Sequence, residues 1–142
     1  MKGYKGFDKN LCCRGFQYEV GKTYEMEGLP IICNRGFHFA AGLSTVEEFY
    51  PLIDYYEYYN NEKTRYIPCF SENRYCEIEA LGEIVGQDEI YPKLATNKIR
   101  IVRELSKEEI HKHIRHWLRY RYTEQEVKVI EDALLGFLGV EV

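Results

Sequence analysis

The sequence predicts an α+β fold: a small, mainly antiparallel sheet with a short helix, followed by a C-terminal helical hairpin. Three observations lead to this prediction. Up to about residue 105, short apolar stretches alternate with turn residues, as strands and loops do. After Leu105 the apolar residues recur at helical spacing behind two capping sequences. The 142 residues show no repeat or linker, so we expect one domain, with a sheet-rich body (1–105) and a helical hairpin (106–142).

Several segments of the body are expected to be strands. Phe16–Tyr24 alternates in part, Leu29–Cys33 is an apolar run, and Gly36–Ala40 (GFHFA) is aromatic. Further along, Arg74–Val85 alternates imperfectly and Asn97–Val102 alternates cleanly. Gly86, Asp88 and Pro92 mark the connection between these last two, and residues 93–96 stay unassigned.

Helices are expected where capping boxes precede apolar periodicity. Ser44 with Glu47 predicts a short helix that ends near Pro51. Ser106 with Glu109 and Thr123 with Glu126 predict the two helices of the hairpin. Their apolar stripes consist of Ile110, Ile114, Trp117 and Leu118, then Val127, Ile130, Ala133, Leu134, Phe137 and Leu138.

Composition excludes some classes of protein. No stretch is apolar enough to span a bilayer, and the first ten residues do not resemble a secretion signal, so we expect a cytoplasmic protein with no membrane partner. The five cysteines are expected to be reduced. Their spacings do not match zinc loops, and His111, His113 and His116 do not share one helix face, so no metal site is expected.

The most distinctive pattern is an acidic tyrosine segment at residues 47–62, which holds five acids and no base. One hypothesis is a docking surface for a basic channel of a partner protein. The alternative is that the tyrosines cover a sheet edge beside a solvated loop. The candidate partner-binding residues are Glu47, Glu48, Tyr50, Asp54, Tyr55, Tyr56, Glu57, Tyr58 and Tyr59.

The first helix of the hairpin carries an opposite charge. Lys112, Arg115 and Arg119 lie among histidines and aromatics in a run without acids, which suggests a basic surface. Because the chain as a whole has a net charge of −4, we do not expect it to bind nucleic acid directly.

The order of several segments resembles a family of proteins frequent in phages and prophages. The segments are KGYKGFDKNLCCRGFQYEVGKTYE, NRGFHFA, EIEALGEI and KLATNKIRIVREL. The resemblance implies a phage accessory protein, and together with the acidic tyrosine segment it suggests an inhibitor of a host protein, such as a nucleic-acid-binding defence effector (an anti-CRISPR-like role). A structural or virion-associated module is an alternative.

A second resemblance, to ADP-ribosyltransferases, implies an enzyme that uses NAD. In that family an early aromatic or basic residue beside glycine and a strand reading Gly-aromatic-aromatic-Phe-Ala form the nicotinamide pocket; Tyr4-Lys5-Gly6 and Gly36–Ala40 are similar to these. A carboxylate must support the charged sugar, with Glu77, Glu79 and Glu83 as candidates. The transferase would then use Tyr4, His38 and Glu79. If the protein is not a transferase, no catalytic residue or cofactor is expected. In that case we expect His38 to be a partly buried histidine that is hydrogen-bonded to the backbone.

Overall fold

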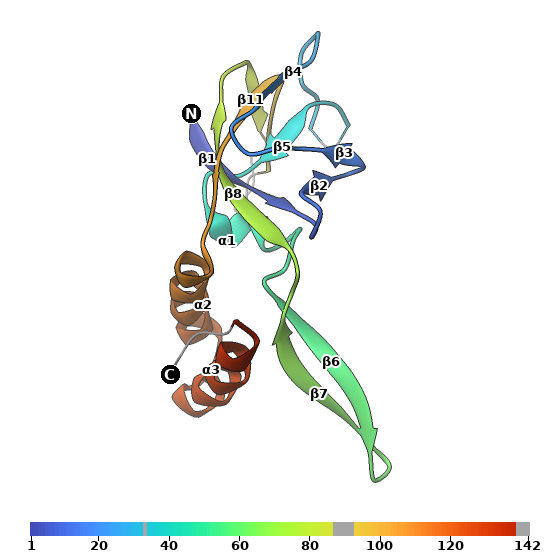
Figure 1. Ribbon diagram of the computed structural model, residues 1–142, viewed down its shortest axis with the longest axis vertical. Helices are drawn as coiled ribbons and strands as arrows, with labels where there is room; N and C mark the ends of the chain where they lie inside the picture. Colours follow the sequence, from blue (N-terminus) through green and yellow to red (C-terminus); the bar gives the residue numbers. More distant parts are fainter. Residues whose placement is uncertain (33, 87–92, 139–142) are drawn as a thin grey trace. The chain divides into compact units, whose positions relative to one another are not determined.

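The structure, a computed structural model, describes residues 1–32, 34–86 and 93–138 (Figure 1). It has an α+β fold with mostly antiparallel sheets and a C-terminal helix pair, as the sequence predicted. The chain divides into two compact units. We call residues 1–50 and 73–105 the sheet unit, and residues 51–72 and 106–138 the hairpin unit. Residues 51–72, which the sequence analysis placed in the sheet-rich body, are grouped with the C-terminal helices.

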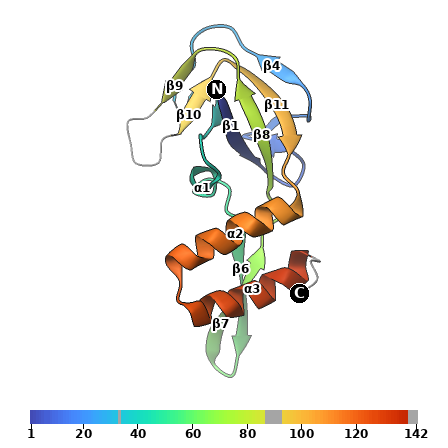
Figure 2. The ribbon, with the colours of Figure 1, turned by 90° about the vertical axis from the view of Figure 1, so that its left-hand side faces the viewer.

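The sheet unit is built on a four-stranded antiparallel sheet in the order β1-β8-β11-β4. A three-stranded sheet in the order β5-β10-β9 and a two-stranded pair of β2 and β3 complete it; Figure 1 labels β2, β3 and β5, and Figure 2 labels β9 and β10. The strands are β1 Lys2–Phe7, β2 Cys12–Cys13, β3 Phe16–Gln17, β4 Thr23–Glu25, β5 Phe37–Phe39, β8 Arg74–Ala80, β9 Ile84–Gly86, β10 Leu94–Thr96 and β11 Lys98–Glu104.

The core of this unit lies on one face of the four-stranded sheet. Phe7, Cys76, Ile78, Ile99 and Ile101 are fully buried there. On β8 and β11 they occupy alternate positions, which all point to the same side of a strand. The clean alternation that predicted a strand near residues 97–102 is thus confirmed by β11.

The edge strand β1 also joins the two larger sheets. The main chains of Tyr4 and Ala40 exchange hydrogen bonds of 2.8 and 2.9 Å. Gly3 permits this approach, because a Cβ atom there would lie 2.6 Å from the carbonyl oxygen of Ala40. The end of β5 is therefore held beside β1, and the short helix α1 (Leu43–Val46) follows it directly.

The hairpin unit contains the strands β6 (Ile53–Asn60) and β7 (Lys63–Phe70), which form a long antiparallel ribbon. The turn consists of Asn61 and Glu62, both with positive φ, which is the geometry that two-residue hairpins prefer. The helices α2 (Lys107–Arg121) and α3 (Glu124–Leu138) contact each other, and α3 contacts β7. Figure 2 shows the two helices side by side.

Both predicted capping boxes of the helix pair are confirmed. Ser106 and Glu109 bond reciprocally at the start of α2, and Thr123 and Glu126 do the same at the start of α3. Five residues of the predicted stripes are buried, namely Ile110, Ile114, Leu118, Val127 and Ile130, and Trp117 is half-buried. Ala133 is exposed, and the side chains of residues 134–138 lie outside the described ones.

Other local predictions were wrong, mostly because turns interrupt the patterns. The run that begins at Leu29 is a turn between Gly28, with φ +84°, and Arg35, in which Leu29 and Ile31 are exposed and Pro30 is buried; Cys33 lies outside the described residues. Residues 16–24 are two short strands separated by a turn at Gly21. Residues 74–85 do not form one strand: β8 ends at Ala80, and the following strand β9 belongs to another sheet.

The acidic tyrosine segment and the preceding cap also differ from expectation. Ser44 does not cap α1, which starts after Gly42 without a side-chain hydrogen bond. Instead of a solvated loop, residues 53–60 form a strand, because residues 63–70 supply an equally long partner. Among residues 1–32, 34–86 and 93–138, no helix is both long and apolar enough to cross a bilayer.

Candidate anion-binding site

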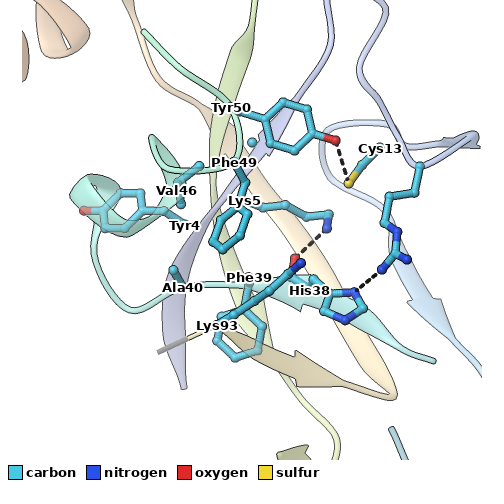
Figure 3. Close-up of a pocket in the computed structure, with 12 residues that line it drawn as sticks. Tyr4, Lys5, Cys13, His38, Phe39, Ala40, Val46, Phe49, Tyr50 and Lys93 are labelled. Carbon is cyan, nitrogen blue, oxygen red and sulfur yellow. Dashed lines mark hydrogen bonds between the residues drawn. The ribbon is translucent and has the colours of Figure 1, made fainter. Parts of the chain in front are cut away.

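Two adjoining cavities open where β1, β5 and the turn between β2 and β3 meet in the sheet unit. The first has a volume of about 190 Å³ and extends toward α1, and the second has about 370 Å³ and extends toward Phe16 and Arg35. Four residues line both cavities: Lys5, Cys13, Arg14 and His38. Figure 3 shows the first cavity, with the side chains of Lys5, Cys13 and His38 converging on it.

A glycine in β1 lets Tyr50, which lines the first cavity, pack directly on this strand. Gly6 lies under the Tyr50 side chain, and a Cβ atom on Gly6 would approach that side chain to 2.8 Å. Tyr50 is half-buried, and its hydroxyl donates a hydrogen bond of 3.1 Å to Cys13 Sγ. The KGYKGF sequence of β1 therefore lets a residue after α1 reach across the strand to the β2 side.

Arg14 is brought to the cavities by a tight turn. Cys13 pairs with Phe16, and the two residues between them, Arg14 and Gly15, have φ angles of +52° and +80°. Two consecutive positive φ angles match the preferred two-residue hairpin turn. This turn holds the exposed Arg14 so that its guanidinium lies 3.5 Å from Nδ1 of His38.

Lys5 lies between the two cavities and is only 3% exposed. Its Nζ donates a hydrogen bond to the main-chain carbonyl of His38, and it lies 5.2 Å from the centre of the Tyr18 ring. Burial lowers the pKa of Lys5, since removal from water disfavours the ammonium form. The opposing influence of Cys13 is smaller than this effect of burial.

The charged side chains described along the cavity walls are all basic. Lys5, Arg14 and Lys93 line the first cavity and Arg35 joins the second, while the residues described along either wall include no Asp or Glu. The chain as a whole carries a net charge of −4. Cations that line a cavity, with no carboxylate along its described wall, produce a local positive potential that favours anions.

His38 responds to this potential. Its side chain is buried, and its pKa is lowered to about 4, first by burial and then by the charges of Lys93, Lys5 and Arg14. A backbone hydrogen bond to Gly36 acts in the opposite direction. His38 is therefore neutral at pH 7, as a buried histidine bonded to the backbone, and this agrees with the interpretation made from the sequence.

Aromatic side chains form much of the remaining wall. The first cavity is lined by Tyr4, Phe39, Phe49 and Tyr50, and Lys93 Nζ lies 4.5 Å from the centre of the Phe49 ring. In the second cavity, Phe16, Tyr18 and Phe37 make edge-to-face contacts. Such walls can hold a planar ring by stacking or edge contacts.

The residues expected for a transferase are only partly brought together. Tyr4 and His38 line the same cavity, as Figure 3 shows. Glu79 does not line it, because it lies opposite Lys2 and Arg100 in the four-stranded sheet. Glu77 forms an ion pair with Arg103. The carboxylate that such a reaction requires is therefore absent from the described wall.

The residues expected for a docking surface are divided between the two units. In the sheet unit, Glu47 is buried, Glu48 is exposed and Tyr50 contributes to the first cavity, so the expectation of one displayed surface was wrong for Glu47 and Tyr50. In the hairpin unit, Asp54 is exposed and Tyr59 is 73% exposed. The side chains of Tyr55, Tyr56, Glu57 and Tyr58 lie outside the described ones.

The expected basic surface of α2 is smaller than its sequence suggested. Lys112 and Arg119 are exposed, but Arg115 forms a 3.0 Å ion pair with Glu131 of α3. The interhelical contact therefore neutralises one of the three charges. The described residues also contain no group of three or more His, Cys, Asp or Glu side chains that would suit a metal ion.

Arg14 and Lys93 were not predicted as site residues from the sequence, and Lys5 was named only within the Tyr4-Lys5-Gly6 stretch. They are far apart in the chain, and no motif connects them. Two local signals were nevertheless available: the glycines that flank Tyr4 and Lys5, and the Arg14-Gly15 pair between short apolar stretches.

The profile of one protein family, described as a domain of unknown function (DUF7666), matches residues 1–113. The chain belongs to the DUF7666 family. The DUF7666 match includes the whole sheet unit and the β6–β7 ribbon, and it ends within α2. Searches of curated proteins and of solved structures found no significant match. The resemblances to phage proteins and to ADP-ribosyltransferases therefore stay predictions.

Proposed function

We propose that the sheet unit binds a small anionic ligand that carries a planar ring, of the class of phosphorylated nucleosides. One observation carries this proposal: the cationic side chains of Arg14, Lys93 and Arg35, together with the buried amine of Lys5, line two adjoining cavities whose described walls contain no carboxylate. The aromatic wall of the first cavity suits the planar ring, and Arg14 and Arg35 are donors suited to phosphate oxygens.

Calorimetric titration with NAD, ADP-ribose and inorganic pyrophosphate tests the proposal. We expect binding that weakens as the salt concentration rises, because the attraction is between charges. Replacing Arg14 with alanine should weaken binding by about 10- to 100-fold, the equivalent of one charged hydrogen bond. Lys112→Ala is the matched control, since it removes the same charge from an exposed position on α2.

Two outcomes would contradict the proposal. One is the absence of binding by all three compounds at millimolar concentration. The other is an equal effect of Arg14→Ala and Lys112→Ala, because it would mean that the net charge of the protein, not the cavity, attracts the ligand.

An NAD-using transferase is a second candidate. It is favoured by the positions of Tyr4, Gly6, Phe39 and Ala40, which line one cavity as the resemblance implies. The position of Glu79 argues for binding without group transfer. Incubation with labelled NAD and a cell lysate separates the two: label transfer that Glu79→Gln abolishes would favour the enzyme, and NAD binding without transfer favours the binding protein.

Inhibition of a host defence protein is a third candidate, now limited to the β6–β7 ribbon. Its support is that Asp54, Tyr59 and Glu62 are all exposed on this ribbon. A pull-down from a host lysate should retain a basic protein, and Asp54→Ala with Tyr59→Ala should release it. Retention that is unchanged by this double variant would remove the ribbon as the docking surface.

A further inference from the structure

Lys5 is a buried lysine without a carboxylate partner among the residues that the structure describes. Its polar contacts are the carbonyl of His38 and the thiol of Cys13, and its other neighbours are the rings of Phe7 and Tyr18 at 5.8 and 5.2 Å. A buried ammonium is costly unless an anion compensates it. This environment therefore favours the neutral amine, which is the nucleophilic form of lysine.

The position of Lys5 gives that amine access to a ligand. Lys5 lines both cavities, so a molecule in either one lies beside it. Arg14 and Lys93 also line the first cavity and would attract an anionic molecule to the same place. Their positive charges lower the pKa of Lys5 further, in the same direction as burial.

Groups that can transfer a proton lie next to the amine. Cys13 is within hydrogen-bonding reach of Lys5, and the Tyr50 hydroxyl lies 3.1 Å from Cys13 Sγ. Figure 3 shows Tyr50 and Cys13 on one side of the Lys5 amine and His38 on the other. An amine that adds to a carbonyl group must lose a proton, and the carbonyl oxygen must gain protons to leave as water.

We propose that Lys5 forms an imine with small anionic aldehydes or ketones that enter the first cavity. The amine nitrogen bonds to the carbonyl carbon, and after proton transfer from nitrogen to oxygen the carbon–oxygen bond breaks. One water molecule leaves, and no oxidant or reductant takes part. The proposal extends the proposed function, because the same cations attract the ligand.

Reductive trapping with glyoxylate tests this proposal on the unmodified protein. Glyoxylate is a small anionic aldehyde, and cyanoborohydride converts its imine to a stable carboxymethyl amine. Peptide mass spectrometry then compares Lys5 with the exposed Lys112 in the same molecules. At pH 6.5 we expect Lys5 to be modified at least about 10-fold faster, since a lysine of ordinary pKa near 10.4 is almost entirely protonated there.

Further comparisons test whether the negative charge of the aldehyde is needed for the preferential modification of Lys5. Glycolaldehyde, which is similar in size but neutral, should lose most of the preference for Lys5, and so should glyoxylate with the Arg14→Ala variant. Pyrophosphate should slow the modification of Lys5 but not that of Lys112. Modification of Lys5 at or below the rate of Lys112 would overturn the proposal.

The same experiment distinguishes failure of the imine from failure of anion binding. If pyrophosphate binds in calorimetry while Lys5 stays unmodified, the imine is refuted and the proposed function stands. If pyrophosphate does not bind and Lys5 is modified without preference, both are refuted.

Discussion

The cavities of the sheet unit and the ribbon of the hairpin unit differ in how charged residues that are near or far in the sequence are arranged in the structure. Residues 47–62 hold five acids and no base, yet the partner strand β7 adds Lys63 and Arg65 to the ribbon, opposite Asn60 and Tyr58. The cations of the cavities come from β1, the β2–β3 turn and the residue before β10, and no sequence window contains them all. The acidic residues of the ribbon, which are near one another in the sequence, therefore share it with basic residues of the partner strand. The basic residues of the cavities are dispersed in the sequence, and folding brings them together.

The largest expected effect tests whether close packing of β1 builds the cavities. Gly3→Ala should destabilise the protein by about 2–3 kcal/mol, because the new Cβ would meet the Ala40 carbonyl oxygen at 2.6 Å and the Phe39 ring at 2.9 Å. Gly42→Ala is the control, since its Cβ meets nothing within 4 Å. Denaturant unfolding measures both, and equal midpoints would show that β1 tolerates a side chain there.

The next effect tests the lowered pKa of His38, which is due first to burial and then to the neighbouring positive charges. Its pKa is about 4 in the folded protein and near 6.5 when unfolded, so between these values only the unfolded chain binds the proton. Stability should therefore fall as the pH is lowered from 6.5 to 4, by about 1 kcal/mol per pH unit from this group. Unfolding of His38→Gln should lack this part of the pH dependence, and the exposed His116→Gln should retain it. Parallel profiles for all three proteins would contradict the assignment.

A smaller effect tests the contact between Tyr50 and Cys13. Tyr50→Phe removes the hydroxyl that donates to Cys13 Sγ and should lower stability by about 1 kcal/mol. Tyr120→Phe, at a position 87% exposed, should change nothing measurable. Thermal unfolding compares the two. A Tyr50→Phe protein as stable as the wild type would mean that the hydrogen bond to Cys13 does not stabilise the position of Tyr50 at the cavity.

The smallest effect is expected in the ribbon. Tyr59→Ser should change stability by no more than about 0.5 kcal/mol, because the side chain is mostly in water, and it should leave pyrophosphate binding unchanged. Denaturant unfolding and calorimetry measure the two properties. A loss of 2 kcal/mol or more, the scale of a buried aromatic contact, would show that the tyrosines of the ribbon serve packing.

The sequence was most informative where the determinants are local. The capping boxes at Ser106 and Thr123 and the apolar stripes behind them predicted α2 and α3 with their boundaries. The β6–β7 ribbon was missed, because its turn is Asn61-Glu62 instead of a glycine-containing pair and its strands do not alternate. Ser44 and Glu47 matched a capping box, yet Glu47 is buried after α1, since packing outweighs a weak local preference.

By itself, the sequence determined the fold class, the helical hairpin and the strands whose apolar residues alternate. These follow from the periodicity of side chains along helices and strands, which each segment carries within itself. Only the tertiary structure decided that Lys5, Arg14, His38 and Lys93 surround common cavities and that the acidic tyrosine segment is divided between two units. The proximity of residues far apart in the chain depends on strand order and register, and these are properties of the whole fold.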